Sequence, residues 1–231
     1  MEAQNSQSPD EGYVISYQTL RKAVGIVGIA LPVVLISAFV LLNPNCYLPP
    51  SLSHYYYTNL GTWFTGTLCV VAFFMFAYNG PHKIDKYASL IACICALGVA
   101  FCPANTYSDA GKNCIRVILN VSDTRNALHY GFAGLLFLTL AFFSLFLFTK
   151  TSGEVTNEKR VRNVIYKVCG WVILLSIAGI AVLTFMGKNP DVADSQPNIA
   201  TYVLETIALV AFGFSWLVKG ETFFAERKPH S

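Results

Sequence analysis

Long apolar runs alternate with short polar stretches along this chain, and that pattern sets the first expectation about its fold. A helix that spans a bilayer needs about 20 predominantly apolar residues, because the hydrocarbon core is roughly 30 Å thick and each residue rises about 1.5 Å. Six runs qualify, at approximately 22–43, 54–79, 84–102, 126–149, 163–186 and 198–218. The runs are continuous and lack the period-two alternation of a β-barrel. The sequence predicts an all-α, polytopic bundle of six transmembrane helices over residues 21–221, with flexible cytoplasmic tails at 1–20 and 222–231.

Small residues within these runs predict where helices approach one another closely. In the third run alanines recur at every fourth position, which lines one helix face with small side chains. These residues are Ala88, Ala92, Ala96 and Ala100. Glycines in the first and fourth runs offer further points of close packing, at Gly25, Gly28, Gly131 and Gly134.

Composition agrees with a membrane protein. Only 13% of the 231 residues are charged while 54% are hydrophobic, and the mean hydropathy is +0.49. A water-soluble domain of this size could not cover itself with so few polar residues, so the apolar side chains are expected to face lipid. The net charge of +3 is small and the basic residues form no stripe, which argues against a nucleic-acid partner. The expected partners are membrane lipids; nothing in the sequence sets the oligomeric state.

The distribution of lysine and arginine predicts the orientation. Cytoplasmic loops of membrane proteins carry an excess of these residues. Twelve lie in or near the tails and the second and fourth connections, against four in the other connections: Arg21, Lys22, Lys83, Lys86, Lys150, Lys159, Arg160, Arg162, Lys167, Lys219, Arg227 and Lys228 against Lys112, Arg116, Arg125 and Lys188. Both termini are therefore expected in the cytoplasm, with residues 44–53, 103–125 and 187–197 facing outward.

Three of the seven cysteines lie on the predicted outer side, where an oxidising compartment would allow a disulfide. They are Cys46, Cys102 and Cys114. We expect Cys102 to pair with Cys114, because that bond would close and constrain a turn-rich loop. The alternative is that all three are free thiols, since an odd number and an unknown compartment both weaken the inference. No role is assigned to Cys46.

Ionisable side chains inside apolar runs are the main functional candidates, because burying them in a membrane is expensive. Glu205 is the single carboxylate well inside a run, and it lies near the outer end of the sixth. His54 and His129 begin the second and fourth runs at the same level. Asn126 precedes His129 by one turn of the same helix face, and Ser51 and Ser53 precede His54. The sequence therefore predicts one outward-facing polar site.

Several chemistries fit this set. His54, His129 and Glu205 together match a two-histidine, one-carboxylate zinc site that would activate water against a lipid ester or amide. The two histidines alone match the axial ligands of a haem. Glu205 in its neutral form could instead hydrogen-bond a histidine or Asn126 and hold helices together. The remaining interpretation, which we place ahead of the metal-dependent hydrolase as a function, is a pocket that binds or transports a lipid or small amphiphile. The chain contains no nucleotide-binding motif.

Four strings resemble a known group of proteins: Ser-Leu-Ser-His-Tyr-Tyr-Tyr-Thr at 51–58, Asn-Ala-Leu-His-Tyr at 126–130, Asn-Val-Ile-Tyr-Lys-Val-Cys-Gly-Trp at 163–171 and Phe-Gly-Phe-Ser-Trp-Leu-Val-Lys-Gly-Glu at 212–221. They are similar to those of uncharacterised bacterial six-helix integral membrane proteins, a domain-of-unknown-function family loosely similar to the DRAM and FRAG families. The resemblance implies a multi-pass bundle in the bacterial inner (plasma) membrane and brings no activity. The chain departs from the zinc-binding alkaline-ceramidase pattern, because two of its four histidines, His82 and His230, fall on the predicted cytoplasmic side.

Overall fold

The computed structural model describes residues 17–78, 80, 82–105, 114, 121–150, 156–186 and 199–223. The predicted tails at 1–20 and 222–231 therefore lie almost entirely outside the described residues. All the regular structure in the described part of the chain is helical. Its elements are α1 (Tyr17–Leu42), the short 3₁₀ helix η1 (Leu52–Tyr57), α2 (Gly61–Ala77), α3 (Lys83–Phe101), α4 (Asp123–Phe142), the π-helical turn η2 (Phe143–Leu147), α5 (Asn157–Phe185) and α6 (Ala200–Lys219).

Five helices of the described chain are long and apolar enough to cross a membrane: α1, α3, α4 continued by η2, α5 and α6. The remaining long helix, α2, is apolar but has only 17 residues. At about 1.5 Å per residue it reaches about 26 Å, somewhat less than the thickness of the hydrocarbon core. The all-helical membrane-protein class expected from the sequence is thus confirmed, with five helices that meet the length of a span.

The predicted second run, 54–79, is not one helix. It is divided into η1 and α2 by a turn in which Thr58 Oγ1 donates to Tyr55 O at 2.9 Å and accepts from Leu60 N at 3.1 Å. A Cβ at Gly61 would overlap the carbonyl oxygen of Tyr56, so this turn needs a glycine. His54 consequently lies in η1, ahead of α2, because hydropathy alone does not register such a local turn.

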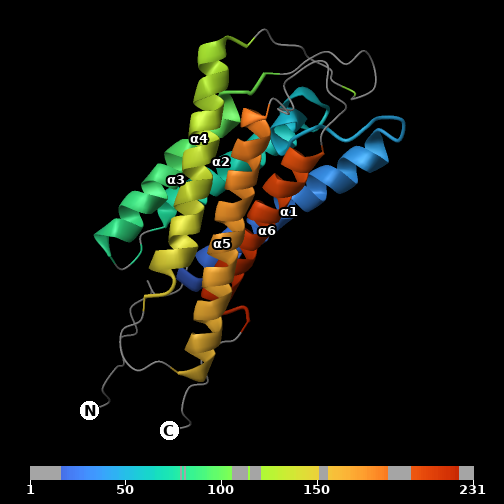
Figure 1. The fold of residues 1–231 in the computed structure, drawn as a ribbon. Coiled ribbons are helices and arrows are strands. Elements are labelled where there is room, and N and C mark those ends of the chain that lie inside the picture. The colour runs from blue at the N-terminus through green and yellow to red at the C-terminus, as the bar shows by residue number, and fades with distance from the viewer. Residues whose placement is uncertain are drawn as a thin grey trace, which may run out of the picture.

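The long helices pack against one another in chain order, and the ring closes where α6 packs against α1 (Figure 1). At that closure the backbones nearly touch. A Cβ on Gly25 would lie 2.8 Å from Gly213 O, and one on Gly213 would lie 2.7 Å from Gly25 O. The predicted close packing at Gly25 is confirmed. It is wrong for Gly131 and Gly134, because no atom lies within 4 Å of a Cβ built at either position.

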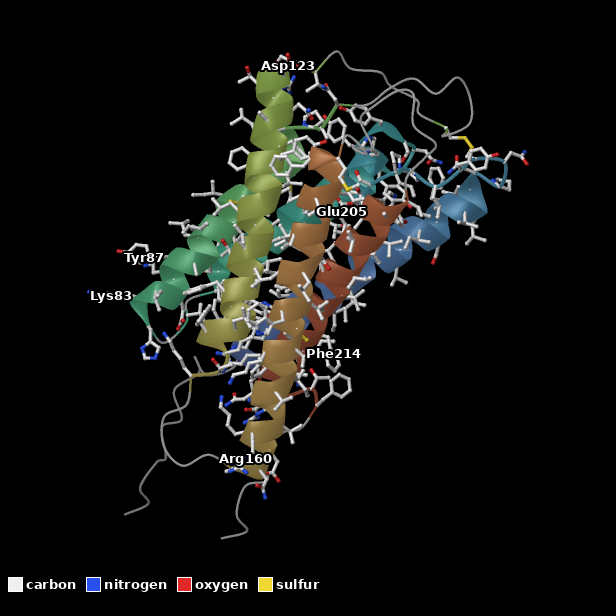
Figure 2. The ribbon with its side chains drawn as sticks, viewed as in Figure 1. Lys83, Tyr87, Asp123, Arg160, Glu205 and Phe214 are labelled. Carbon is white, nitrogen blue, oxygen red and sulfur yellow. A yellow bond between two sulfur atoms is a disulfide. The ribbon has the colours of Figure 1, made fainter. Side chains whose placement is uncertain are left out.

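Contacts between helix termini divide the bundle into two ends. We call "the basic end" the one where α1, α3 and α5 begin and where α2, α4 and α6 finish. There Arg21 near the start of α1 donates to the hydroxyl of Tyr78 after α2 at 3.4 Å. Lys159 in α5 and Lys219 in α6 both donate to Phe148 O, each at 3.3 Å. The opposite end, which carries η1, His54 and His129, is "the histidine end". Figure 2 shows Asp123 and Arg160 at opposite ends of the molecule.

The four alanines of α3 are all buried, with exposed fractions from 0% to 6%. They belong to the main core cluster, on the helix that packs between α2 and α4. The predicted small-residue face of α3 is therefore confirmed. Together with the α1–α6 closure, it brings the helices close enough to hold the histidine end in a defined arrangement.

Candidate functional site

A cavity of about 350 Å³ lies at the histidine end, and its walls differ in chemistry. One wall is polar and comes from η1 and its flank, α4 and the start of α6. The other is apolar and comes from α4 and α5. The polar wall holds Ser51, Ser53, His54, His129, Thr201 and Glu205, and the apolar wall includes Ala133, Gly134, Phe137, Ile177, Ile180 and Phe185.

The apolar wall follows from helix periodicity. The lining residues of α4 fall at 129, 130, 133, 134 and 137, and those of α5 at 177, 180, 181, 184 and 185, so each helix presents one face to the cavity. Ala181, Thr184 and Phe185 are exposed, which places the opening beside the last turns of α5. This wall was not predicted from the sequence, although the spacing from His129 to Phe137 contains the signal.

The polar wall is built on η1, which three large side chains hold in place. Tyr55 packs edge-on against Phe39 of α1, with ring centroids 5.5 Å apart, and its hydroxyl lies 2.9 Å from that of Tyr202 on α6. Tyr57 donates a hydrogen bond to Ala104 O. Leu52 is also buried, at 4% exposure. Residues three apart share a face in a 3₁₀ helix, and Ser53 and Tyr56 form its half-buried face.

Glu205 fixes η1 to α6. Its Oε2 accepts a hydrogen bond from the backbone N–H of Leu52 at 2.6 Å, a short contact of the charge-assisted kind. Leu52 lies between Ser51 and Ser53, so the carboxylate sets the position of both serines relative to α6. Figure 2 shows Glu205 near the start of α6, toward the histidine end.

Each histidine is hydrogen-bonded to a different serine. His54 Nδ1 lies 2.6 Å from Ser51 Oγ, and both side chains are buried. His129 Nε2 lies 2.9 Å from Ser53 Oγ, and its Nδ1 lies 2.7 Å from Cys102 O. A carbonyl oxygen can only accept, so Nδ1 of His129 carries a proton. In the neutral ring Nε2 is then the acceptor, and the Ser53 hydroxyl donates to it.

Asn126 does not line the cavity but holds the segment that orients His129. Its Oδ1 accepts a hydrogen bond from Asn105 N at 2.9 Å. Asn126 and His129, one turn apart on α4, therefore both hydrogen-bond to the same short segment after α3. Cys102 N also donates to Gly98 O at 2.8 Å, which anchors the start of that segment to the last turn of α3.

The predicted site residues thus meet, but not as a metal centre. Among the residues that the structure describes, no three histidine, cysteine, aspartate or glutamate side chains are placed to hold a metal ion. His129 is instead placed between a carbonyl and a hydroxyl: its Nδ1 donates to Cys102 O and its Nε2 accepts from Ser53 Oγ.

The predicted Cys102–Cys114 disulfide is wrong. Cys114 is bonded to Cys46, which follows α1, with Cα atoms 5.9 Å apart, and Cys102 is a free cysteine. The reason is geometric. All three cysteines lie at the histidine end, and there the fold brings Cys46 to Cys114 while Cys102 caps the last turn of α3. Proximity in sequence favoured the wrong partner.

Comparisons with known proteins gave no match to this chain, whether among family models, curated proteins or solved structures. Its function is therefore inferred from the geometry of the chain itself.

Proposed function

We propose that this chain is a six-span integral membrane protein with both termini in the cytoplasm. Two observations support six passes. Successive long helices alternate between the two ends of the bundle, and Gln18 at the start of α1 donates to Glu221 after α6 at 2.8 Å. In this proposal α2 spans with a slight local thinning of the bilayer, at a modest cost in free energy. The basic end faces the cytoplasm, consistent with the lysine and arginine count, and the bacterial inner membrane is the location that the resemblance implies.

Reporter fusions test this topology. Alkaline phosphatase fused after Ser231 should be inactive, because it would remain in the cytoplasm, and the same reporter inserted in the connection between α3 and α4 should be active. Activity at both sites, or at neither, would rule out the six-span arrangement, and the reverse pattern would rule out cytoplasmic termini.

We propose further that the cavity at the histidine end binds one lipid or other small amphiphile. The observation that carries the proposal is the division of a single cavity into a polar wall from η1, α4 and α6 and an apolar wall from α4 and α5. Ligand sites commonly combine a mainly apolar lining with a few polar groups that fix orientation. A headgroup would lie against Ser53, His54 and Glu205, and an acyl chain along Phe137 and Ile180.

The charge of the polar wall narrows the class of headgroup. Glu205 lines this wall, and in this proposal it is ionised; a carboxylate repels an anionic headgroup in a medium of low dielectric constant. The hydroxyls and imidazoles beside it offer both donors and acceptors. A neutral or zwitterionic headgroup rich in hydroxyl or ester oxygens therefore fits best.

Gly134 gives a sharp test of binding. It lines the cavity, and a Cβ at this position has open space around it. Gly134→Leu should fill the cavity without a clash and should keep or slightly raise stability, because leucine is the better helix former by about 0.5–1 kcal/mol. We expect it to weaken the binding of a fluorescent lysophosphatidylcholine at least tenfold in detergent micelles.

Gly131→Leu is the matched control. Gly131 lies one turn earlier on α4, also in open space, but is not part of the cavity lining. It should gain the same helix stability and bind the probe like the unmodified protein. The proposed pocket would be contradicted if both variants bound the probe like the unmodified protein, or if both lost binding to the same extent.

A further inference from the structure

Ser53 and His129 stand in the geometry of a nucleophile and its general base. The diagnostic arrangement is a hydroxyl within hydrogen-bond reach of a base that a third group orients. Here the Ser53 Oγ to His129 Nε2 distance is 2.9 Å, and Cys102 O holds the opposite ring nitrogen at 2.7 Å. The tautomer that the carbonyl imposes leaves Nε2 as the proton acceptor.

Accessibility separates Ser53 from Ser51, while both histidines are buried, each with an exposed fraction of 3%. Ser51 and His54 are both buried, with exposed fractions of 4% and 3%. Ser53 is half-buried on the side of η1 that lines the cavity. An acyl group that enters beside α5 can therefore reach Ser53 Oγ, whereas Ser51, which also borders the cavity, is only 4% exposed.

We propose that Ser53 and His129 form a metal-free catalytic dyad that hydrolyses a carboxylic ester of the amphiphile in this cavity. This inference rests on the proposed binding function and assigns that site a reaction and a substrate class. An ester is favoured over an amide because a neutral backbone carbonyl stabilises the imidazolium less than the carboxylate of a triad does. The alkoxide of an ester is a better leaving group than the nitrogen of an amide, so an ester suits His129, which is the weaker base.

The reaction proceeds in two balanced halves. Ser53 Oγ attacks the acyl carbon while its proton passes to His129 Nε2; the ester C–O bond then breaks, and Nε2 returns the proton to the leaving alkoxide, which departs as an alcohol. In the second half, water gives one proton to Nε2 and its oxygen adds to the acyl carbon. The bond to Ser53 Oγ breaks, Oγ regains the proton, and a carboxylic acid leaves. The sum is ester plus water to acid plus alcohol.

Asn126 and Tyr57 are positioning residues in this scheme. Asn126 holds Asn105, and Tyr57 donates to Ala104 O, so both fix the backbone that carries the Cys102 carbonyl. Their removal should allow the His129 ring to turn. We expect lower kcat with little change in KM, because the ring acts on the reacting proton more than on binding.

An alkyl fluorophosphonate, which acylation-competent serines attack, tests the dyad on the full-length protein in nanodiscs. We expect one covalent adduct per chain at Ser53, located by peptide mass spectrometry. His129→Gln should slow labelling by about 10²–10⁴-fold, the usual contribution of a general base. Ser37→Ala is the matched control, since Ser37 is exposed on α1 away from the cavity, and it should label normally.

Two outcomes overturn the inference and differ in what they say about binding. If the unmodified protein takes no label, or takes it at another residue, while it still binds fluorescent lysophosphatidylcholine in a way that Gly134→Leu blocks, the dyad is wrong and the binding function stands. If the protein neither labels nor binds the probe, both proposals fail. The main measurement is on the unmodified chain, so it does not depend on any variant folding.

Discussion

The two ends of the bundle both contain buried polar groups but use them differently. At the basic end, two lysine side chains are directed at backbone carbonyls where helices finish. At the histidine end, hydroxyl and imidazole groups are directed at one another around a cavity. The contrast separates polar groups that complete helix termini from polar groups that border a cavity.

At the basic end the polar contacts complete the helix termini. Lys159 Nζ donates to Phe148 O and to Lys150 O, at 3.3 and 3.1 Å, and thereby satisfies carbonyls left over where α4 and η2 finish. Trp216 is fully buried among Tyr78, Phe143 and Phe148, with centroid distances of 5.1 to 5.4 Å. The two lysines there are directed at backbone, and aromatic rings fill the space between helices.

At the histidine end the polar groups border open space. Ser53, His129 and Glu205 each make a hydrogen bond and also line the cavity. The connections there are joined covalently by the Cys46–Cys114 disulfide. This end therefore relies on one covalent bond and a hydrogen-bonded network, where the basic end relies on packing.

Removing the central ring of the basic end should have the largest effect on stability. Replacing a buried aromatic side chain with alanine costs about 3–5 kcal/mol. We expect Trp216→Ala to cost about 3–4 kcal/mol, because the indole Nε1 is a buried donor without an acceptor in the described structure and its loss offsets part of the penalty. Trp63→Ala is the control, since Trp63 is 64% exposed; it should change the free energy of unfolding by less than about 0.5 kcal/mol. Unfolding in mixed micelles measures both, and equal losses would show that the basic end is not the packed region.

Breaking the disulfide should have a smaller effect, confined to the histidine end. A disulfide typically contributes about 2–4 kcal/mol by constraining the unfolded chain. We expect the low end, about 2 kcal/mol, for Cys46→Ala, because helices inserted in a bilayer already restrict the unfolded state. Mass spectrometry of non-reduced digests should find the Cys46–Cys114 linkage in the unmodified protein, with Cys102 alkylated. Linkage through Cys102 would reverse this assignment. Cys69→Ala, away from the disulfide, serves as control.

The smallest effect should come from one hydroxyl that holds η1. Burial, the larger cause, and a hydrogen bond between the Tyr55 and Tyr202 hydroxyls raise the pKa of Tyr55 above its ordinary value of 10.0. The neutral phenol therefore stabilises the fold fully below about pH 10, and this stability falls as pH rises above that value, because the unfolded chain loses the proton first. Tyr55→Phe should cost about 1 kcal/mol at pH 7 and should flatten the decline in stability between about pH 9 and 11. Tyr47→Phe, at an exposed tyrosine, should keep the decline; an unchanged slope in Tyr55→Phe would show that another group causes it.

Much of the histidine end could be predicted from the sequence. Because polar groups are costly to bury in a membrane, the sequence indicates His54, His129 and Glu205 as a candidate site. Because successive runs alternate in direction, the sequence also predicts that the three residues lie at one level. The structure brings them to one cavity with Ser51 and Ser53. The sequence also predicts Asn126 as part of this site, because it lies one turn before His129 on the same helix face. In the structure Asn126 contacts Asn105 instead of the cavity.

The remaining features could not be predicted from the chain in this way. Gly134 looks like a packing glycine, and only the arrangement of α5 and α6 shows that its missing side chain leaves room in a cavity. The break before α2 depends on the turn at Thr58 and Gly61, which a hydropathy window averages away.

By itself the sequence determined the class of protein, the placement of most apolar helices and the depth of the polar residues, because hydropathy is a local property that each segment carries with it. Only the tertiary structure decided that Cys114 joins Cys46, that Ser53 faces His129 while Ser51 faces His54, and that Cys102 contributes its carbonyl instead of its thiol. These choices depend on the directions in which distant segments approach and on the space left between them. Neither quantity is present in any one stretch of the chain.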